Sequence, residues 1–181
     1  MVGARGFKRP QRAVFISNHC SQSDIFVICY LPWEMKWLFK DSLFKIPVFG
    51  WSLQFTGDIS IKRGDRASAQ ASMKRCQAYV ENGMPVMIFP EGTRSKTDEM
   101  QPFKDGAFRL AIESQAALVP LAVSGTSKAL PKHDWRFGDA RATVQVGQPI
   151  STEGMTLEDV ATLKEAARTQ IQDMRDAVSA T

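Results

Sequence analysis

Short hydrophobic segments alternate along this chain with segments of helical periodicity, and this alternation limits the possible folds more than any other feature. Strands that are separated by helices pair in parallel, so the pattern predicts an α/β fold with a mixed, largely parallel central sheet flanked by helices. The length of 181 residues suits a single domain that covers residues 1–181. We expect strands at residues 12–17, 36–40, 58–62, 85–89, 117–123 and 142–146, and helices at residues 24–31, 66–81 and 105–114.

The C-terminal helix has the clearest pattern. Thr156, followed three residues later by Asp159, predicts a capping box at its first turn. Residues 46–55 form an apolar stretch of ambiguous type, broken by Gly50, and Pro120 indicates an edge strand or a break in the strand at residues 117–123. Hydrophobic residues that recur at steps of three and four predict a core-facing stripe on the C-terminal helix, made of Leu157, Val160, Leu163, Ala167, Ile171, Met174 and Val178.

The excess positive charge is concentrated at the N-terminus. The net charge is +4, and Arg5, Lys8, Arg9 and Arg12 account for all of it, so that the remaining basic and acidic residues balance. This balance argues against a nucleic-acid partner. The basic N-terminal segment, residues 1–12, suits anionic headgroups, and we expect it to be the remnant of a membrane-proximal region.

Cysteines and histidines are too few for a disulfide framework or a zinc site. The 3 cysteines form no CxxC pair, which favours a reducing compartment. The 2 histidines, His19 and His133, lie far apart in the sequence, and we expect no metal site. His133 lies in a polar, turn-like stretch and is expected to be a solvated loop residue. The longest apolar runs are shorter than the roughly 18–20 residues that a membrane-crossing helix needs.

Aromatic residues are concentrated between Phe15 and Phe55, where Lys36, Lys40 and Lys45 are interspersed with them. Two interpretations are open. In the first, these residues form a core from which some aromatic side chains protrude. In the second, they form a surface that lies in a lipid headgroup layer, where aromatic and lysine side chains act together.

A candidate base and an acid that could orient it follow the first expected strand. His19 comes directly after this strand, and Asp24 begins the next helix. If the loop between them curls back, Asp24 can hold one ring nitrogen of His19 and leave the other free as a base. The alternative is that Asp24 only caps the helix. Cys20 is a weaker candidate, as a nucleophile, because neighbouring side chains on an extended segment diverge.

Two further segments at strand ends carry groups that suit an anion. Lys62 and Arg63 end one strand, where loops of α/β sheets bind ligands, although an exposed charged turn explains them equally well. The buried strand at residues 85–89 leads into Glu91, Gly92, Thr93, Arg94 and Ser95. The glycine lets backbone amides approach an anion, Arg94 can bind phosphate oxygens, and the hydroxyls can donate hydrogen bonds. Together with His19 and Asp24, these segments predict general-base catalysis on a phosphorylated substrate.

The order of four motifs resembles that of the 1-acylglycerol-3-phosphate acyltransferases, also called lysophosphatidic acid acyltransferases. The motifs are NHxxxxD at residues 18–24, GxxxxxR at residues 57–63, FPEGTRS at residues 89–95 and VPLAV at residues 119–123. The likeness continues through residues 102–108 and 147–150 and covers most of the chain. The FPEGTRS form is more similar to the lysophosphatidate enzymes than to the related glycerol-3-phosphate acyltransferases.

The resemblance implies a glycerol-phosphate acyltransferase-like fold and the transfer of a fatty acyl group to the sn-2 hydroxyl of lysophosphatidate, which forms phosphatidate. The donor would be an acyl thioester of coenzyme A or of acyl carrier protein, the latter being a candidate partner, with no other cofactor. His19 would be the general base and Asp24 its partner, at the cytoplasmic face of a membrane. The candidate substrate-binding residues are Lys62, Arg63, Glu91, Gly92, Thr93, Arg94 and Ser95.

Family members usually carry a hydrophobic helical segment before the histidine motif, whereas eighteen residues precede His19 here. We therefore expect a missing N-terminal segment, a partner or the aromatic-rich stretch to provide the membrane contact. Three other functions compete with the main one. The chain could acylate another lysophospholipid, or it could be a catalytically silent lipid-binding module, which would need neither His19 nor Asp24. A serine hydrolase is the weakest alternative, because Ser124 lies outside any GxSxG motif.

Overall fold

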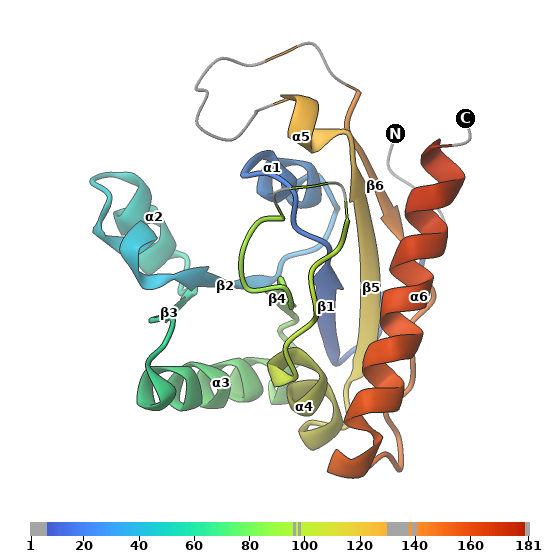
Figure 1. Cartoon of the computed structure of the whole chain (residues 1–181). Coiled ribbons are helices and arrows are strands. Elements are labelled where there is room, and N and C mark those ends of the chain that lie inside the picture. Colours follow the sequence, from blue (N-terminus) through green and yellow to red (C-terminus); the bar gives the residue numbers. More distant parts are fainter. Residues whose placement is uncertain (1–6, 96, 98, 130–137, 139–140, 180–181) are drawn as a thin grey trace.

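The computed structural model describes residues 7–95, 97, 99–129, 138 and 141–179 (Figure 1). Six strands form one sheet in the order β3-β2-β4-β1-β5-β6. All neighbours pair in parallel except β5 and β6, which pair antiparallel, so the predicted mixed, largely parallel α/β sheet is confirmed. His133 and the first six residues of the basic N-terminal segment lie outside the described residues. The strands are β1 (Ala13–Ser17), β2 (Lys36–Lys40), β3 (Ile59–Ile61), β4 (Val86–Ile88), β5 (Ala117–Ser124) and β6 (Thr143–Val146).

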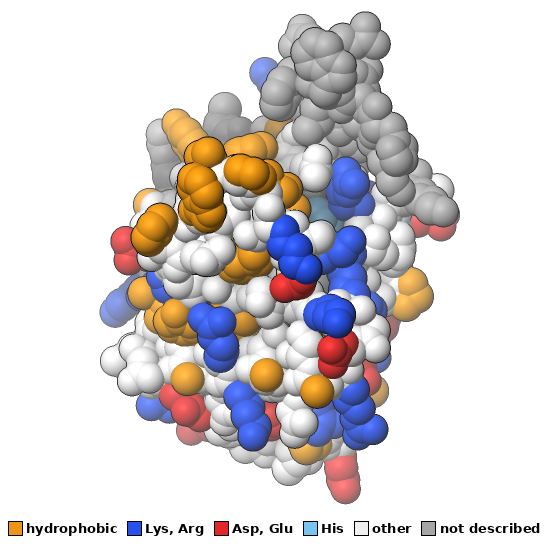
Figure 2. Space-filling view, turned by 90° about the vertical axis from the view of Figure 1, so that its left-hand side faces the viewer, with side chains coloured by type: hydrophobic (Ala, Val, Ile, Leu, Met, Phe, Trp, Pro, Cys, Tyr) orange, Lys and Arg blue, Asp and Glu red, His pale blue; other side chains and the backbone are white. Residues whose placement is uncertain are grey.

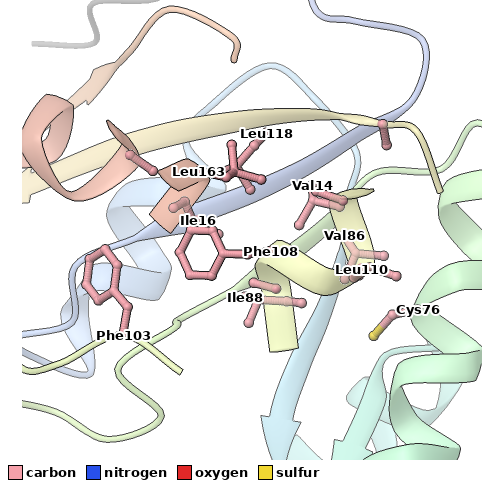
Figure 3. Close-up of a cluster of buried hydrophobic side chains, with 14 of the residues drawn as sticks. Val14, Ile16, Cys76, Val86, Ile88, Phe103, Phe108, Leu110, Leu118 and Leu163 are labelled. Carbon is pink, nitrogen blue, oxygen red and sulfur yellow. The ribbon is translucent and has the colours of Figure 1, made fainter. Parts of the chain in front are cut away.

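The sheet has helices on both faces, because its central strand is hydrophobic on both sides. All five residues of β1 are fully buried, and the four hydrophobic ones alternate between two clusters. The first cluster joins Val14 and Ile16 to α3 (Arg66–Glu81), α4 (Gly106–Glu113) and α6 (Val160–Ser179), as Figure 3 shows. The second joins Phe15 to α1 (Ser23–Cys29) and α2 (Phe49–Phe55). The short elements are η1 (Asp41–Lys45), α5 (Thr126–Ala129) and η2 (Leu157–Asp159).

The C-terminal helix follows its predicted pattern with one exception. The Asp159 carboxylate accepts a hydrogen bond from the Thr156 backbone N–H at 2.7 Å, and the capping box is complete. Leu163 and Ile171 are fully buried against the sheet. Leu157 lies in η2, before α6 begins, and is 45% exposed, so its predicted place in the core-facing stripe is wrong.

Two irregular positions differ from expectation. Residues 46–55 contain α2, and Gly50 lies inside this helix and does not break it. The position requires glycine, because a Cβ there would stand 2.2 Å from the Phe44 carbonyl oxygen. Pro120 lies in the middle of β5, which pairs with β1 on one side and β6 on the other, so the expected edge or break is wrong for β5 itself. The missing N–H is tolerated because β6 ends at Val146, before the position opposite Pro120, and the Pro120 carbonyl oxygen still accepts from the Gly147 N–H at 2.8 Å.

None of the helices within the described parts of the chain combines the length and the apolar character needed to cross a membrane.

Candidate active site

The candidate catalytic groups lie together at the carboxyl end of the parallel strands, where α/β sheets bind their ligands. His19 follows β1, Glu91 follows β4 and Thr126 follows β5. Because β1 lies between β4 and β5 in the sheet, the loops that carry these three residues meet at one place. The topology therefore brings side chains together that are up to about a hundred residues apart in the sequence.

Asp24 holds His19 as the curled-back loop predicts. The Asp24 carboxylate is fully buried, and its Oδ2 lies 2.8 Å from Nδ1 of His19. The same oxygen accepts hydrogen bonds from the backbone N–H groups of Cys20 and Ser21, at 2.8 and 2.9 Å. The other oxygen accepts from the hydroxyl of Thr126. A carboxylate with four hydrogen-bonding partners is fixed in place, and it fixes the ring that it contacts.

The imidazole of His19 is oriented to act through its second nitrogen. Because Nδ1 faces a carboxylate, that nitrogen carries the proton of the neutral ring, and Nε2 has the free lone pair. The ring stacks on Phe89, with the centroids 4.0 Å apart and the planes inclined by 17°. The side chain of His19 is 12% exposed, so its free edge reaches the surface while its body is packed.

Asn18 fixes the start of the histidine loop. Its side-chain amide donates to the Val123 carbonyl oxygen at 2.8 Å and accepts from the Val123 backbone N–H at 2.8 Å. The side chain thus takes the place of a peptide group and continues the pairing of β1 with β5 beyond Ser17.

Glu91 joins the loops around His19. It is buried, and its two carboxylate oxygens accept hydrogen bonds from the backbone N–H groups of His19, at 2.7 Å, and Gln101, at 3.0 Å. Burial raises the pKa of Glu91, while these two hydrogen bonds oppose that rise. The guanidinium of Arg168 on α6 holds the segment that Glu91 contacts, because it donates to the Gln101 and Met100 carbonyl oxygens, both at 3.0 Å.

A cluster of basic side chains adjoins the histidine. Arg63 follows β3, and its charge interacts with that of Arg94. Partial burial, and then the charge of Arg94, lower the pKa of the Arg63 guanidinium. Among the described residues, neither guanidinium has a carboxylate within ion-pair distance. Gly92 has a φ of +69°, and a Cβ there would stand 2.7 Å from Nζ of Lys104, so the glycine lets this third basic side chain cross the loop. Figure 2 shows basic side chains gathered beside the histidine.

Comparison with known proteins shows which family the chain resembles. A family model described as Acyltransferase matches residues 2–124. The chain belongs to this acyltransferase family. The predicted family resemblance is thereby confirmed, and the catalytic roles of individual residues stay predictions.

The named relatives of this chain come from distant organisms. The chloroplastic 1-acyl-sn-glycerol-3-phosphate acyltransferase BAT2 of Brassica napus is 41% identical over 118 residues, which are 65% of this chain and 34% of that protein. The human 1-acyl-sn-glycerol-3-phosphate acyltransferase alpha is 34% identical over 170 residues, which are 92% of this chain and 59% of that protein. The chain thus spans between a third and three fifths of the length of these relatives.

The fold of this chain is similar to that of a solved structure. The crystal structure of the 1-acyl-sn-glycerophosphate acyltransferase from Thermotoga maritima superposes with a TM-score of 0.85. The match covers 100% of this chain and 72% of that one, at 22% sequence identity.

Not every predicted substrate-binding side chain is equally available. Thr93 is exposed on the loop beside Arg94. Ser95 is buried, and its hydroxyl donates to the Glu99 carbonyl oxygen at 2.7 Å while its backbone N–H donates to the His19 carbonyl oxygen. Lys62 is exposed, and its ammonium lies 3.9 Å from Asp65, at the start of α3. Arg63, which is also exposed, and Arg94 are the candidate side chains whose positive charges interact.

The environment of Cys20 does not favour a nucleophile. Burial, and then the negative charge of Asp24, raise the pKa of the thiol. A thiol with a raised pKa is protonated at neutral pH, and the thiolate is the reactive form. The site therefore offers a base in His19 and no activated sulfur beside it.

Sequence reasoning gave no role to Asn18, Phe89, Lys104 or Thr126. Three of them, Asn18, Phe89 and Lys104, lie inside or next to the motifs, and this position could have marked them as candidate site residues. Thr126 carries no such signal, because its only link to Asp24 is that β5 lies beside β1.

Proposed function

We propose that this protein transfers a fatty acyl group from an acyl thioester to the sn-2 hydroxyl of lysophosphatidate and thereby forms phosphatidate. The observation that carries the proposal is the histidine held by a buried aspartate. Arg94 directly precedes Ser95, whose backbone N–H donates to the His19 carbonyl oxygen, and the charge of Arg94 acts on Arg63. The names of the relatives support the same reaction. A lipid-binding module without activity would have no use for an oriented imidazole.

In the proposed reaction His19 acts as a general base. Its Nε2 accepts the proton of the sn-2 hydroxyl while the hydroxyl oxygen attacks the carbonyl carbon of the thioester. The tetrahedral intermediate then collapses, the carbon–sulfur bond breaks, and the leaving thiolate takes the proton from the imidazolium. Asp24 stabilises the imidazolium between these two steps through its contact with Nδ1. A positioned base of this kind typically contributes about 10²- to 10⁴-fold to the rate.

The basic cluster supports a phosphate monoester as the headgroup of the acceptor. A phosphate monoester carries about −1.5 to −2 charges at neutral pH, and guanidinium groups bind its oxygens in a bidentate manner. Headgroups with a choline or ethanolamine cation would place a like charge near Arg63 and Arg94. The cluster therefore favours lysophosphatidate over zwitterionic lysophospholipids.

The proposed acceptor is tested by offering the purified protein a panel of acceptors, each with acyl-CoA and with acyl-ACP. The panel contains lysophosphatidate, lysophosphatidylcholine, lysophosphatidylethanolamine and glycerol 3-phosphate, and the acylated products are quantified by mass spectrometry. We expect phosphatidate as the main product. Preferred acylation of another lysophospholipid would replace the proposed acceptor, and a folded protein that acylates nothing would favour the silent lipid-binding module.

Removing the Arg94 side chain should weaken acceptor binding selectively. We expect Arg94→Ala to raise KM for lysophosphatidate by about tenfold or more, since a hydrogen bond to a charged group is worth about 1.5–3 kcal/mol. KM for the thioester should change little. Arg109→Ala is a matched control, because Arg109 is an exposed arginine on α4 that pairs with Glu113 at 3.5 Å. Equal effects of the two variants would remove Arg94 from the phosphate site.

Direct transfer makes Cys20 dispensable. We expect Cys20→Ala to keep at least about a third of the wild-type rate, because the thiol is protonated and forms no covalent intermediate. Initial rates with lysophosphatidate and acyl-CoA measure this. If Cys20→Ala and His19→Ala were both inactive while folded, a mechanism with a cysteine-bound acyl group would be favoured.

A further inference from the structure

Helices α1 and α2 cover one face of the sheet, yet they present large hydrophobic side chains to solvent. Of the eight large hydrophobic side chains exposed among the described residues, seven lie between Phe26 and Phe55. Figure 2 shows hydrophobic side chains gathered on this face, next to basic ones. We define the aromatic surface by its five most exposed members, which are Phe26 (66%), Tyr30 (80%), Val48 (71%), Trp51 (58%) and Phe55 (91%).

Helix α1 links the aromatic surface to the active site. Its inner side carries Asp24 and Ile28, which are fully buried, and its outer side carries Phe26 and Tyr30, which lie one helical turn apart. One short helix therefore supports the carboxylate that holds His19 and exposes two aromatic rings on its opposite side. A helix with its side chains is about 10–12 Å across, so whatever covers the rings lies about that far from the catalytic pair.

Helix α2 projects the other part of the aromatic surface. Trp51 and Phe55 lie one turn apart on this helix, which Figure 1 places at the end of the molecule away from α6. Val48 precedes it with φ of +67° and ψ of −59°, and the Phe49 N–H donates to the Pro47 carbonyl oxygen at 2.8 Å. This is a classic γ-turn, which is strained for a β-branched residue. In the protein by itself no burial of Val48 compensates for that strain.

We propose that the aromatic surface inserts into the headgroup region of a membrane that contains anionic lipids. The surface protrudes, as insertion into lipid requires, and it combines Trp, Tyr and Phe with the exposed lysines Lys40 and Lys45. Aromatic rings at the level of the headgroups with lysines beside them are typical of proteins that lie in a membrane interface. The choice of a lipid occupant rests in part on the proposed function, because lysophosphatidate and phosphatidate are both membrane lipids.

Insertion along this surface would place the active site at the edge of the bilayer. Phe26 and Tyr30 would enter the interface while Asp24, on the other side of α1, holds His19 just above it. The headgroup of lysophosphatidate could then reach Arg63 and Arg94 while its acyl chain stays in the lipid. The aromatic surface thus orients the protein so that the acceptor reaches the active site without leaving the membrane.

The proposal is tested by vesicle binding of a double variant, Trp51→Ser with Phe55→Ser, in the full chain. Flotation with vesicles of phosphatidylcholine and phosphatidylglycerol measures binding, and Leu157→Ser is the matched control, since Leu157 is exposed in η2 outside the aromatic surface. Both targets are more than half exposed, so the melting temperature should stay within a few degrees. We expect the double variant to bind about tenfold or more weakly than wild type and the control to bind normally.

Activity on a short-chain, water-soluble lysophosphatidate separates this proposal from the proposed function. We expect the double variant to acylate the soluble acceptor at the wild-type rate and the vesicle-embedded acceptor more slowly. Wild-type binding by the double variant would overturn the membrane proposal. Unchanged binding together with loss of a dimer in gel filtration would assign the surface to a second copy instead. Weaker binding in a protein that acylates no acceptor would support the membrane surface and contradict the proposed function.

Discussion

Replacing His19 with alanine is expected to lower the rate of acyl transfer by about 10²- to 10⁴-fold, because the reaction then loses its positioned base. The fold should survive, since Asp24 keeps its hydrogen bonds from Cys20, Ser21 and Thr126. Initial rates with lysophosphatidate and acyl-CoA measure the effect, and circular dichroism with thermal melting checks the fold.

The size of this loss distinguishes catalysis from packing. The ring of His19 also stacks on Phe89, so its removal opens a gap beside the sheet. A variant such as His19→Phe keeps an aromatic ring in that gap but has no base, and we expect it to be as inactive as the alanine variant. A rate within about threefold of wild type for either variant would show that another group acts as the base.

Replacing Asp24 with asparagine should have the second-largest effect, a fall in kcat of about 10²- to 10⁴-fold. Asparagine is nearly isosteric, and its oxygen can still accept from the backbone N–H groups of Cys20 and Ser21. Its amide can donate to the hydroxyl of Thr126, so the loop should keep its shape. The negative charge that stabilises the imidazolium is lost, and the tautomer of His19 is no longer fixed.

The readout for Asp24→Asn is the separation of kcat from KM. We expect kcat to fall while KM for lysophosphatidate and the melting temperature stay close to wild type, because Asp24 is a positioning residue that does not reach the substrate. Thr126→Val is the control, since it removes a hydrogen bond to the same carboxylate but keeps the charge. We expect this control to lose about tenfold at most. A rise in KM without a fall in kcat would mean that Asp24 only shapes the loop.

The sequence predicted the six strands and the helices α1, α3, α4 and α6, and it offered His19 and Asp24 as a candidate pair, whereas α2 stayed ambiguous and η1 and α5 were not predicted. Strand and helix positions follow from local periodicity, and His19 and Asp24 flank a single loop, so their contact needs no knowledge of the remaining chain. The same holds for the capping box of Thr156 and Asp159, where the two partners are three residues apart. Local patterns therefore predict those parts of the structure in which the partners are neighbours in the sequence.

Contacts between distant segments could not be predicted in this way. Asn18 bonds Val123, and Asp24 bonds Thr126, across more than a hundred residues in each case. Both contacts depend on β5 pairing with β1, which periodicity does not specify. Pro120 was misinterpreted for a related reason: its effect depends on where the neighbouring strand stops, and that is a property of β6.

The aromatic-rich stretch shows why both of its interpretations were reasonable. Phe15, Trp37 and Phe39 belong to the buried core, and Trp37 and Phe39 stack with their ring centroids 5.6 Å apart. Phe26 lies between Phe15 and Trp37 in the sequence, Phe55 follows Phe39, and both are exposed. The two groups differ only in the side of their strand or helix, which becomes known when the sheet is in place.

The most direct test of the central claim measures thiol release and phosphatidate formation together, with labelled acyl-CoA in the presence and absence of lysophosphatidate. Direct transfer with His19 as the base predicts that thiol release requires the acceptor, that one phosphatidate forms for each thiol released, and that no label remains on the protein. Thiol release without acceptor, with label bound to the protein, would contradict this account, and so would a folded protein that forms no phosphatidate.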